Sequence, residues 1–189
     1  CVIASKLKQG HGVTVKTKLH FAHGNGFPSP CYRQMLEGLT SHFDCCYLDK
    51  IGHADAFPVD DNWGTLVDEL IDSVKTQSNQ PVVALGHSLG GVLSLLAALK
   101  SPDLFKAVVL LDSPLLSRGR SRVVKLAKKT GFIDRITPAY RTRARRTHWA
   151  SREDAFVYLK RRMLFQHITD ACLNDYIEYG MTHDETGCS

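Results

Sequence analysis

The 189-residue sequence lacks the short motifs by which proteins bind the common organic cofactors. It contains neither a Gly-x-Gly-x-x-Gly fingerprint nor a P-loop, so the usual dinucleotide and nucleotide sites are excluded. Residues of metal-ligating type are scattered. His53 with Asp55, and His183 with Asp184 and Glu185, are too isolated to form a ligand set of useful spacing. We therefore expect no metal and no cofactor.

Cys-x-x-Cys pairs are absent as well, although the sequence has six cysteines. Cys45 and Cys46 are adjacent in an apolar stretch, where they cannot comfortably bridge each other. The others are Cys1, Cys31, Cys172 and Cys188. We interpret all of them as reduced thiols, which are typical of a cytoplasmic protein.

The sequence has little that would direct it to or through a membrane. Its apolar start is only four residues long before Lys6 and Lys8 follow, which is too short for a secretory signal. Residues 82–99 carry no formal charge over 18 positions, the lower limit for a membrane span. Three glycines inside this run favour a buried strand, a tight turn and a buried helix instead. We expect no stable membrane insertion, and the missing initiator Met suggests a fragment.

Acidic residues are in the minority in the second part of the chain. Residues 1–113 hold 9 Lys and Arg against 11 Asp and Glu, whereas residues 114–189 hold 15 against 8. We interpret the basic runs at 125–129 and 141–146 as a solvated helical face, because charge runs usually mean no more than that. Nucleic-acid binding is disfavoured, since no recognition module accompanies the charge. A basic cap that attracts an anionic or carboxylate-bearing substrate is the alternative.

Short apolar runs alternate with segments of helical period over the first 113 residues. This alternation is typical of a mostly parallel sheet covered by helices, so we predict the α/β class. Strands are predicted at residues 13–17, 18–22, 45–48, 82–85 and 107–111, and helices at 31–42, 63–75 and 92–100. Later in the chain, Ser151 followed by Asp154 resembles a capping box and predicts one helix over residues 151–168. We therefore divide the chain into a core at 1–113 and a basic helical cap at 114–189.

The strongest functional signal is segment 86–91, Gly-His-Ser-Leu-Gly-Gly, which fits the Gly-x-Ser-x-Gly nucleophile elbow between a strand and a helix. Such a sharp turn brings the flanking backbone so close that side chains two residues from the serine are poorly tolerated, and Gly86 and Gly90 meet this demand. The turn would present the Ser88 hydroxyl at a helix N-terminus, where the Leu89 backbone N–H can stabilise an oxyanion. Ser88 is therefore the candidate nucleophile.

A second signal is the glycine-rich segment 23–28, His-Gly-Asn-Gly-Phe-Pro, directly after a predicted strand. Such a loop lets a backbone N–H approach a substrate oxygen with no side chain in the way. Together with the elbow and with Leu-Leu-Asp-Ser-Pro at 110–114, it resembles the α/β-hydrolase superfamily, and its bacterial-type single-domain members in particular. The resemblance covers residues 18–189.

The resemblance implies roles for single residues. Asn25 and Leu89 would supply the two oxyanion N–H groups, and His23 would be a structural residue that braces the loop. The catalytic order in this superfamily is serine, acid, histidine, and Asp112 occupies one of the two positions used for the acid. Asp112 is therefore the candidate acid. Two alternatives stay open, namely that it only caps the strand end, and that the acid lies beyond Ser189.

The histidine that should complete the triad is missing from the pattern. By the resemblance, two more strands follow the cap and the last loop carries the histidine, yet nothing after residue 170 has the pattern of a strand. His183 lies in a polar stretch, and His53 and His87 match family positions that are not the general base. We expect no histidine within about 2.6–3.2 Å of the Ser88 hydroxyl, poor activity of the chain by itself, and an unprotected sheet edge at 107–111.

These features predict a serine hydrolase that cleaves a small acyl substrate, an ester, thioester or amide, through an acyl-enzyme on Ser88. Dehalogenases and epoxide hydrolases of this fold use Asp at the nucleophile position, so the serine argues against both. Two alternatives remain. One is an acyltransferase, and the other is a non-catalytic binding module that keeps the elbow without the base. The acyl group, the leaving group and the oligomeric state stay open.

Overall fold

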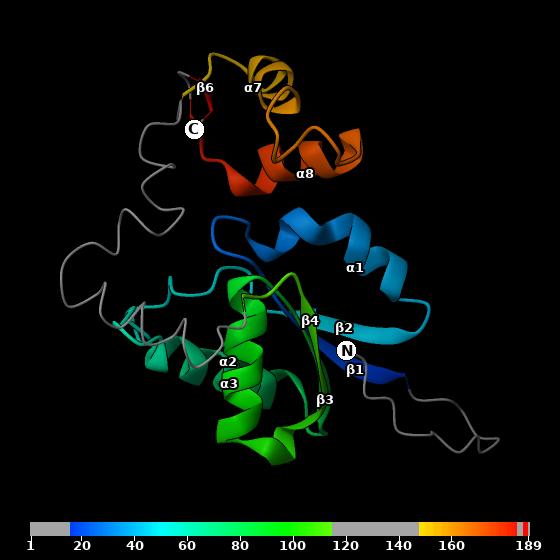
Figure 1. The fold of residues 1–189 in the computed structure, drawn as a ribbon, viewed down its shortest axis with the longest axis vertical. Coiled ribbons are helices and arrows are strands. Elements are labelled where there is room, and N and C mark those ends of the chain that lie inside the picture. The colour runs from blue at the N-terminus through cyan, green and yellow to red at the C-terminus, as the bar shows by residue number, and fades with distance from the viewer. Residues whose placement is uncertain (1–15, 115–147, 185–186, 189) are drawn as a thin grey trace.

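A parallel sheet of four strands lies at the centre of the molecule (Figure 1). The computed structural model describes residues 16–114, 148–184 and 187–188. The strands are β1 (Thr17–Ala22), β2 (Phe43–Tyr47), β3 (Val82–His87) and β4 (Phe105–Leu111), in the order β2-β1-β3-β4. The inner strands β1 and β3 carry buried apolar runs, as parallel strands covered on both faces do. The predicted α/β class is confirmed.

Helices cover both faces of this sheet. They are η1 (Ser29–Tyr32), α1 (Arg33–Leu39), α2 (Gly64–Gln77), α3 (Leu89–Lys100) and η2 (Pro102–Leu104). Ala22 of β1 packs with α2 and α3 on one face, whereas the preceding Phe21 packs with α1 on the other. This is the alternation expected of a strand that is buried on both sides.

The register of the sheet brings the carboxyl ends of β1, β3 and β4 to one edge. Ala22 pairs with Gly86, and His87 pairs with Leu111. The segments that leave these strand ends therefore meet at this edge, which is where parallel sheets usually bind their ligands.

The predicted core elements agree with the structure to within a few residues. The strand predicted at 45–48 begins earlier, at Phe43, and the helix predicted at 31–42 ends at Leu39. The helix closes there because both the N–H and the hydroxyl of Thr40 bond to the carbonyl of Glu37. Of the strand predicted at 13–17, the first three positions lie outside the described residues, Lys16 is not in a strand, and Thr17 is the first residue of β1.

Strand β4 is one edge of the described sheet. None of its residues is buried, and Val109 is 40% exposed. Within the described part of the chain, the strand thus has the open edge that we expected, with apolar surface on it.

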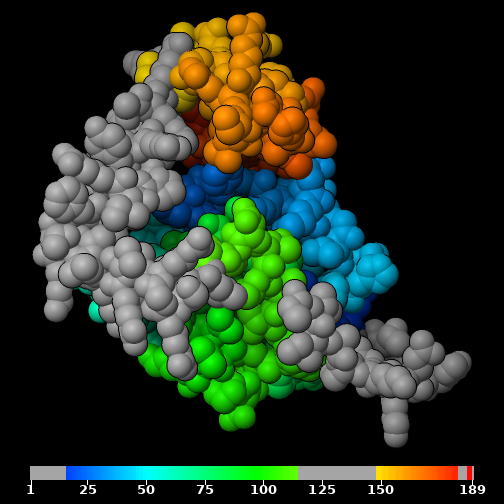
Figure 2. Space-filling view, viewed as in Figure 1, coloured from blue at the N-terminus to red at the C-terminus, as the bar shows by residue number. Residues whose placement is uncertain are grey.

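The cap forms a smaller layer on the core. It consists of α7 (Arg152–Lys160), α8 (Asp170–Gly180) and a hairpin of β5 (His183–Asp184) and β6 (Gly187–Cys188). Its own apolar core contains Trp149, Ala155, Leu159, Phe165, Leu173, Ile177 and Cys188. In the space-filling view, the orange surface of the cap rests on the blue surface of the N-terminal segment that carries η1 (Figure 2). Both basic runs lie outside the described residues.

The prediction of one helix over residues 151–168 is wrong. Ser151 does cap a helix, since its hydroxyl accepts the backbone N–H three residues later at 3.1 Å. That helix ends at Lys160, and the turns that follow bury Phe165 and leave Met163 85% exposed. The chain leaves the helical path after Lys160 because Phe165, and not Met163, packs into the apolar core of the cap.

The absence of strands after residue 170 is also a wrong prediction. β5 and β6 pair antiparallel, and Trp149 and Cys188 exchange two backbone hydrogen bonds of 2.9 Å. Each strand has only two residues, so no alternating pattern could show in the sequence. The hairpin belongs to the cap and does not extend the main sheet.

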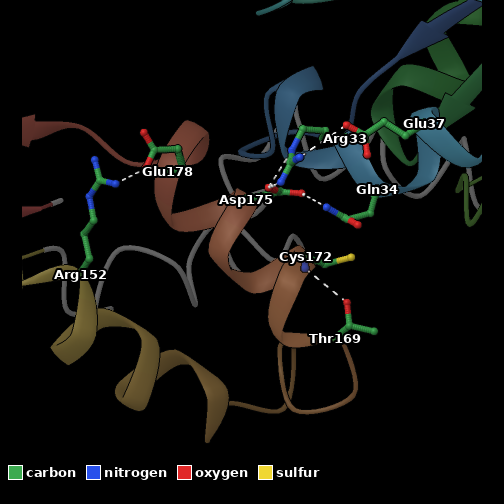
Figure 3. A network of polar contacts seen from close by, with 8 residues as sticks. All are labelled: Arg33, Gln34, Glu37, Arg152, Thr169, Cys172, Asp175 and Glu178. Carbon is green, nitrogen blue, oxygen red and sulfur yellow. Dashed lines mark hydrogen bonds and ion pairs between the residues drawn. The ribbon is translucent and has the colours of Figure 1, made fainter.

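A buried carboxylate joins the cap to the core. Asp175 of α8 is 3% exposed and accepts hydrogen bonds from Arg33 Nη2 at 2.7 Å, Arg33 Nε at 3.1 Å and Gln34 Nε2 at 3.3 Å (Figure 3). The pKa of Arg33 is raised, chiefly by its hydrogen bond to Asp175. Arg33 donates both hydrogen bonds to Oδ1 and Gln34 donates to Oδ2, so the contact fixes orientation as well as distance and sets the position of α8 on α1.

Asp175→Asn is expected to raise the fraction of molecules in which α8 is open about tenfold, because the amide lacks the charge that holds Arg33 and its NH2 group cannot accept the hydrogen bond from Gln34. Limited proteolysis measures this, since cleavage follows the population of the opened segment. Glu178→Gln, a change on the same helix α8, is the matched control, because the ion pair between Glu178 and Arg152 of α7 is exposed (Figure 3). Equal cleavage rates in the two variants would contradict the assignment.

His20 is a buried polar residue in the middle of the core. It is 1% exposed, and its Nε2 lies 2.9 Å from Ser73 Oγ. Within the described part of the chain, its Nδ1 has no hydrogen-bond partner. Burial lowers the pKa of His20 from 6.5 to about 4, so the folded state holds the ring neutral.

His20 should make the protein less stable in acid. The unfolded chain takes up this proton near pH 6.5 and the folded chain only near pH 4, so stability is full above 6.5 and falls as the pH drops to 4. The free energy of unfolding should fall by about 3 kcal/mol over this range. Urea unfolding of the wild type and of His20→Gln, which cannot titrate, checks this. An equal dependence on pH in both proteins would exclude His20 as the cause.

Candidate active site

Ser88 lies on a strained turn between β3 and α3. Its φ is 50° and its ψ is −116°, a conformation that residues other than glycine adopt only under constraint. Its N–H donates to Leu111 O at 2.9 Å, and its carbonyl accepts the Gly91 N–H at 3.2 Å. The residue is half-buried at the N-terminus of α3. The turn therefore has the geometry of a nucleophile elbow.

Three glycines make this turn possible. A Cβ at Gly86 would lie 2.4 Å from the Gly91 nitrogen, and one at Gly90 would lie 2.1 Å from the carbonyl oxygen of Ala22. Gly91, which sequence reasoning did not single out, is as crowded, since its Cβ would lie 1.9 Å from Ser113 Oγ. At Gly86 and Gly90 the crowding atoms belong to the backbone, so the turn tolerates no side chain there. At Gly91 the nearest atom is a side-chain hydroxyl that can rotate, and the nearest backbone atom, the Gly86 carbonyl oxygen, would lie 2.9 Å away.

The loop at 23–28 lies against this elbow. A Cβ at Gly24 would lie 2.6 Å from His87 Nδ1, so the loop and the elbow are in direct contact. The loop itself is a tight turn, closed by Phe27 N–H donating to the Gly24 carbonyl at 3.1 Å, with Gly26 at φ 76°. Asn25 is exposed at the tip of this turn.

The two N–H groups named as oxyanion donors come from these adjacent segments. Leu89 is the first residue of α3, where a backbone N–H has no partner within the helix. Among the residues that the structure describes, no group accepts a hydrogen bond from the N–H of Asn25 or of Leu89. Both N–H groups are therefore unpaired within the described part of the chain.

His23 holds the loop from behind. The residue is buried, its Nε2 accepts the Ile51 N–H at 2.8 Å, and its Nδ1 donates to the Gly24 carbonyl at 2.9 Å. These two bonds require the neutral ring, and burial accordingly lowers the pKa of His23. The geometry fits the structural role that the resemblance implies for this histidine.

Phe27 attaches the same loop to the cap. Its ring centroid lies 4.7 Å from that of Tyr176 and 6.0 Å from that of Phe165, both of the cap. The apolar core of the cap therefore includes one residue from the loop beside Ser88.

Asp112 follows β4 directly, at the strand end next to the elbow. Its φ is 44°, so two neighbouring strand ends carry a residue other than glycine with positive φ. The side chain is exposed and makes no hydrogen bond or ion pair with any described residue. The negative charge of Asp112 raises the pKa of His87, but burial of the ring lowers that pKa by more, so the net shift is downward. The carboxylate thus lies close enough to act on the charge of His87, and it has no partner among the described residues.

None of the histidine side chains that the structure describes hydrogen-bonds to Ser88. His87 Nδ1 lies 2.7 Å from the Tyr32 hydroxyl, and His53 Nδ1 lies 3.1 Å from the Ile51 carbonyl. That the general base is not among these residues stays a prediction. The side chain of His183 lies outside the described part.

The sequence matches the model of the Alpha/beta hydrolase family over residues 21–180. The chain belongs to the alpha/beta hydrolase family. The matched stretch contains the loop, the elbow and most of the cap. The resemblance noted from three short motifs is thereby confirmed.

Relatives within the alpha/beta hydrolase family are longer than this chain. It is 33% identical over 132 residues to a monoglyceride lipase homolog of Monkeypox virus, which covers 65% of this chain and 47% of the relative. It is 28% identical over 144 residues to (E)-2-((N-methylformamido)methylene)succinate hydrolase of Acinetobacter baylyi, and this match covers 73% of this chain and 53% of the relative. The chain thus spans about half the length of these curated relatives.

A solved structure of the family shares the architecture. The crystal structure of E-2-(acetamidomethylene)succinate hydrolase superposes with a TM-score of 0.64 at 19% identity, over 92% of this chain and 59% of that one. At this identity the likeness establishes the fold alone.

Two cavities of this alpha/beta hydrolase lie away from the elbow. One of about 610 Å³ is lined by the loop after β2, including Asp49 and His53, by Glu69 of α2 and by Tyr179 of α8. The other, of about 450 Å³, lies beside β2 and α1. Ser88 lines neither. Residues 115–147, which connect Pro114 to the described part of the cap, lie outside the described residues.

Two features are absent from the described residues. No helix there is long and apolar enough to cross a membrane. No group of three or more His, Cys, Asp or Glu side chains there is arranged to hold a metal ion.

Proposed function

We propose that the protein is a serine hydrolase that cleaves an ester, thioester or amide of a small acyl substrate through an acyl-enzyme on Ser88. The observation that carries this proposal is the Ser88 turn, with its φ of 50° and crowded glycines on either side. Strain of this kind costs about 1–3 kcal/mol and clusters at active sites. Membership of the family, and two relatives named as a lipase homolog and a hydrolase, support the same chemistry.

In the proposed reaction, Ser88 Oγ attacks the acyl carbonyl carbon while a base takes the hydroxyl proton. The carbonyl oxygen becomes negative and accepts hydrogen bonds from the N–H groups of Asn25 and Leu89, with the dipole of α3 adding to the stabilisation. Collapse of the intermediate breaks the bond to the leaving group, which takes the proton. Water then attacks the acyl-enzyme, and the carboxylic acid is released.

Asp112 is the proposed acid of the triad. Its carboxylate is unpaired within the described part of the chain and lies at the strand end beside the elbow. From there it would orient an imidazole and stabilise the imidazolium that forms. We place that imidazole outside the described residues, and we expect the 189 residues by themselves to be poorly active.

Further expectations from the sequence stay part of this proposal. They are the division into a core at 1–113 and a basic cap at 114–189, a small-molecule acyl substrate, and a cytoplasmic location. The basic cap would then shape the substrate pocket above Ser88.

Turnover of p-nitrophenyl acetate by the full-length protein, with and without added ethanol, tests the proposal. A burst of p-nitrophenol followed by steady release of acetate is the expected result, because acylation precedes hydrolysis. Ethyl acetate as the main product would indicate an acyltransferase. Binding of the ester without release of p-nitrophenol would favour a non-catalytic binding module.

A further inference from the structure

Tyr32 connects the loop at 23–28 to the elbow. Its hydroxyl oxygen accepts the Gly24 N–H at 3.2 Å and lies 2.7 Å from His87 Nδ1. Its ring packs on Phe21 of β1, with 4.7 Å between the ring centroids. Gly24 immediately precedes the proposed oxyanion donor Asn25, and His87 immediately precedes the proposed nucleophile. The phenol therefore stands between the two halves of the site.

The hydrogen bonds around Tyr32 have one consistent direction. Its oxygen already accepts from Gly24, so its own proton is free to go to His87 Nδ1. This requires the neutral His87 ring with its proton on Nε2. Burial of the phenol and of the imidazole favours both neutral forms, raising the pKa of Tyr32 to about 12 and lowering that of His87.

We propose that Tyr32 and His87 are positioning residues that hold the Asn25 N–H in register with the Ser88 hydroxyl. Among the described residues, the hydrogen bonds that join the loop to the elbow run through Tyr32. The Gly24 carbonyl is fixed separately, by Phe27 N–H and by His23 Nδ1. This inference rests on the proposed function, because a register between the donor and the nucleophile matters only if Ser88 attacks a carbonyl.

Tyr32→Phe in the full-length protein tests this role. It should lower kcat for p-nitrophenyl acetate by about tenfold to a hundredfold and leave KM within about twofold, because a misplaced donor weakens transition-state binding alone. Tyr47→Phe is the matched control. Tyr47 packs in the same apolar cluster, and its hydroxyl has no hydrogen bond within the described part of the chain. Its kcat should equal that of the wild type.

A pair of variants at His87 separates positioning from simple packing. His87→Asn keeps an acceptor where Nδ1 stands and should retain kcat within about threefold, whereas His87→Leu removes the acceptor and should match Tyr32→Phe. This pair decides the question even if Tyr32→Phe fails to fold. Wild-type kcat in Tyr32→Phe or His87→Leu would overturn the inference, as would equal losses in His87→Asn and His87→Leu. Full activity in Ser88→Ala would instead count against the proposed function, and the two failures can therefore be told apart.

Discussion

Replacing Ser88 with alanine is expected to lower kcat of the full-length protein for p-nitrophenyl acetate by about 10⁴-fold or more. The variant loses the oxygen that forms the acyl-enzyme, so only the binding site and the oxyanion donors remain to assist direct attack by water. The fold should survive, because the backbone of the turn sets the φ of 50° at this position and alanine strains it no more than serine does. Initial rates give the loss in kcat, and urea unfolding shows that the protein is intact.

Ser113→Ala is the control for this experiment. Ser113 lies beside the elbow, and its hydroxyl donates to the Leu111 carbonyl at 3.3 Å. Removing this hydroxyl leaves the backbone at Ser88 as it is, so kcat should stay within about threefold of the wild type. A comparable loss in both variants would assign the effect to local structure and not to nucleophilic attack.

Gly90→Ala should have the largest effect on stability. Its Cβ would lie 2.1 Å from the carbonyl oxygen of Ala22 and 2.5 Å from that of His23, and both are backbone atoms of the neighbouring strand end. Overpacking against rigid backbone forces α3 away from β1, so the free energy of unfolding should fall by about 3 kcal/mol or more. Urea unfolding measures this, and loss of soluble protein would be the extreme form of the same result.

Gly38→Ala is the matched control for Gly90→Ala. Gly38 lies within α1, and a Cβ there would meet nothing within 4 Å. Alanine favours a helix over glycine by about 0.5–1 kcal/mol, so this variant should be slightly more stable than the wild type. Equal stability of the two variants would mean that the elbow can relax, against the steric account of its glycines.

The core could be predicted from the sequence because its signals are local. The apolar residues 82–85 fit a strand buried on both faces, and the spacing of Gly86 and Gly90 specifies the turn that follows. The end of α7 has no such signal. Met163 fits the helical period, but the chain turns because Phe165 packs with the other apolar residues of the cap, and that choice depends on tertiary contacts.

Contacts between distant segments could not be predicted either. Tyr32 lies 55 positions from His87, and Arg33 lies 142 positions from Asp175. Neither pair has a spacing or motif that relates its members, because the sheet register and the docking of α8 bring them together. The crowding of Gly91 by Ser113 arises in the same way. The sequence therefore indicates which segments form the site, and the structure shows how they are held against one another.

Labelling of the full-length protein with a fluorophosphonate probe, followed by location of the adduct by tandem mass spectrometry, shows directly whether Ser88 is the nucleophile. Fluorophosphonates react with serine hydroxyls that are activated for attack on an acyl-like centre. One adduct is expected, on Ser88, and it should be lost in Ser88→Ala and retained in Ser113→Ala. An unlabelled Ser88 in a protein that hydrolyses p-nitrophenyl acetate, or an adduct on any other residue, would contradict this expectation.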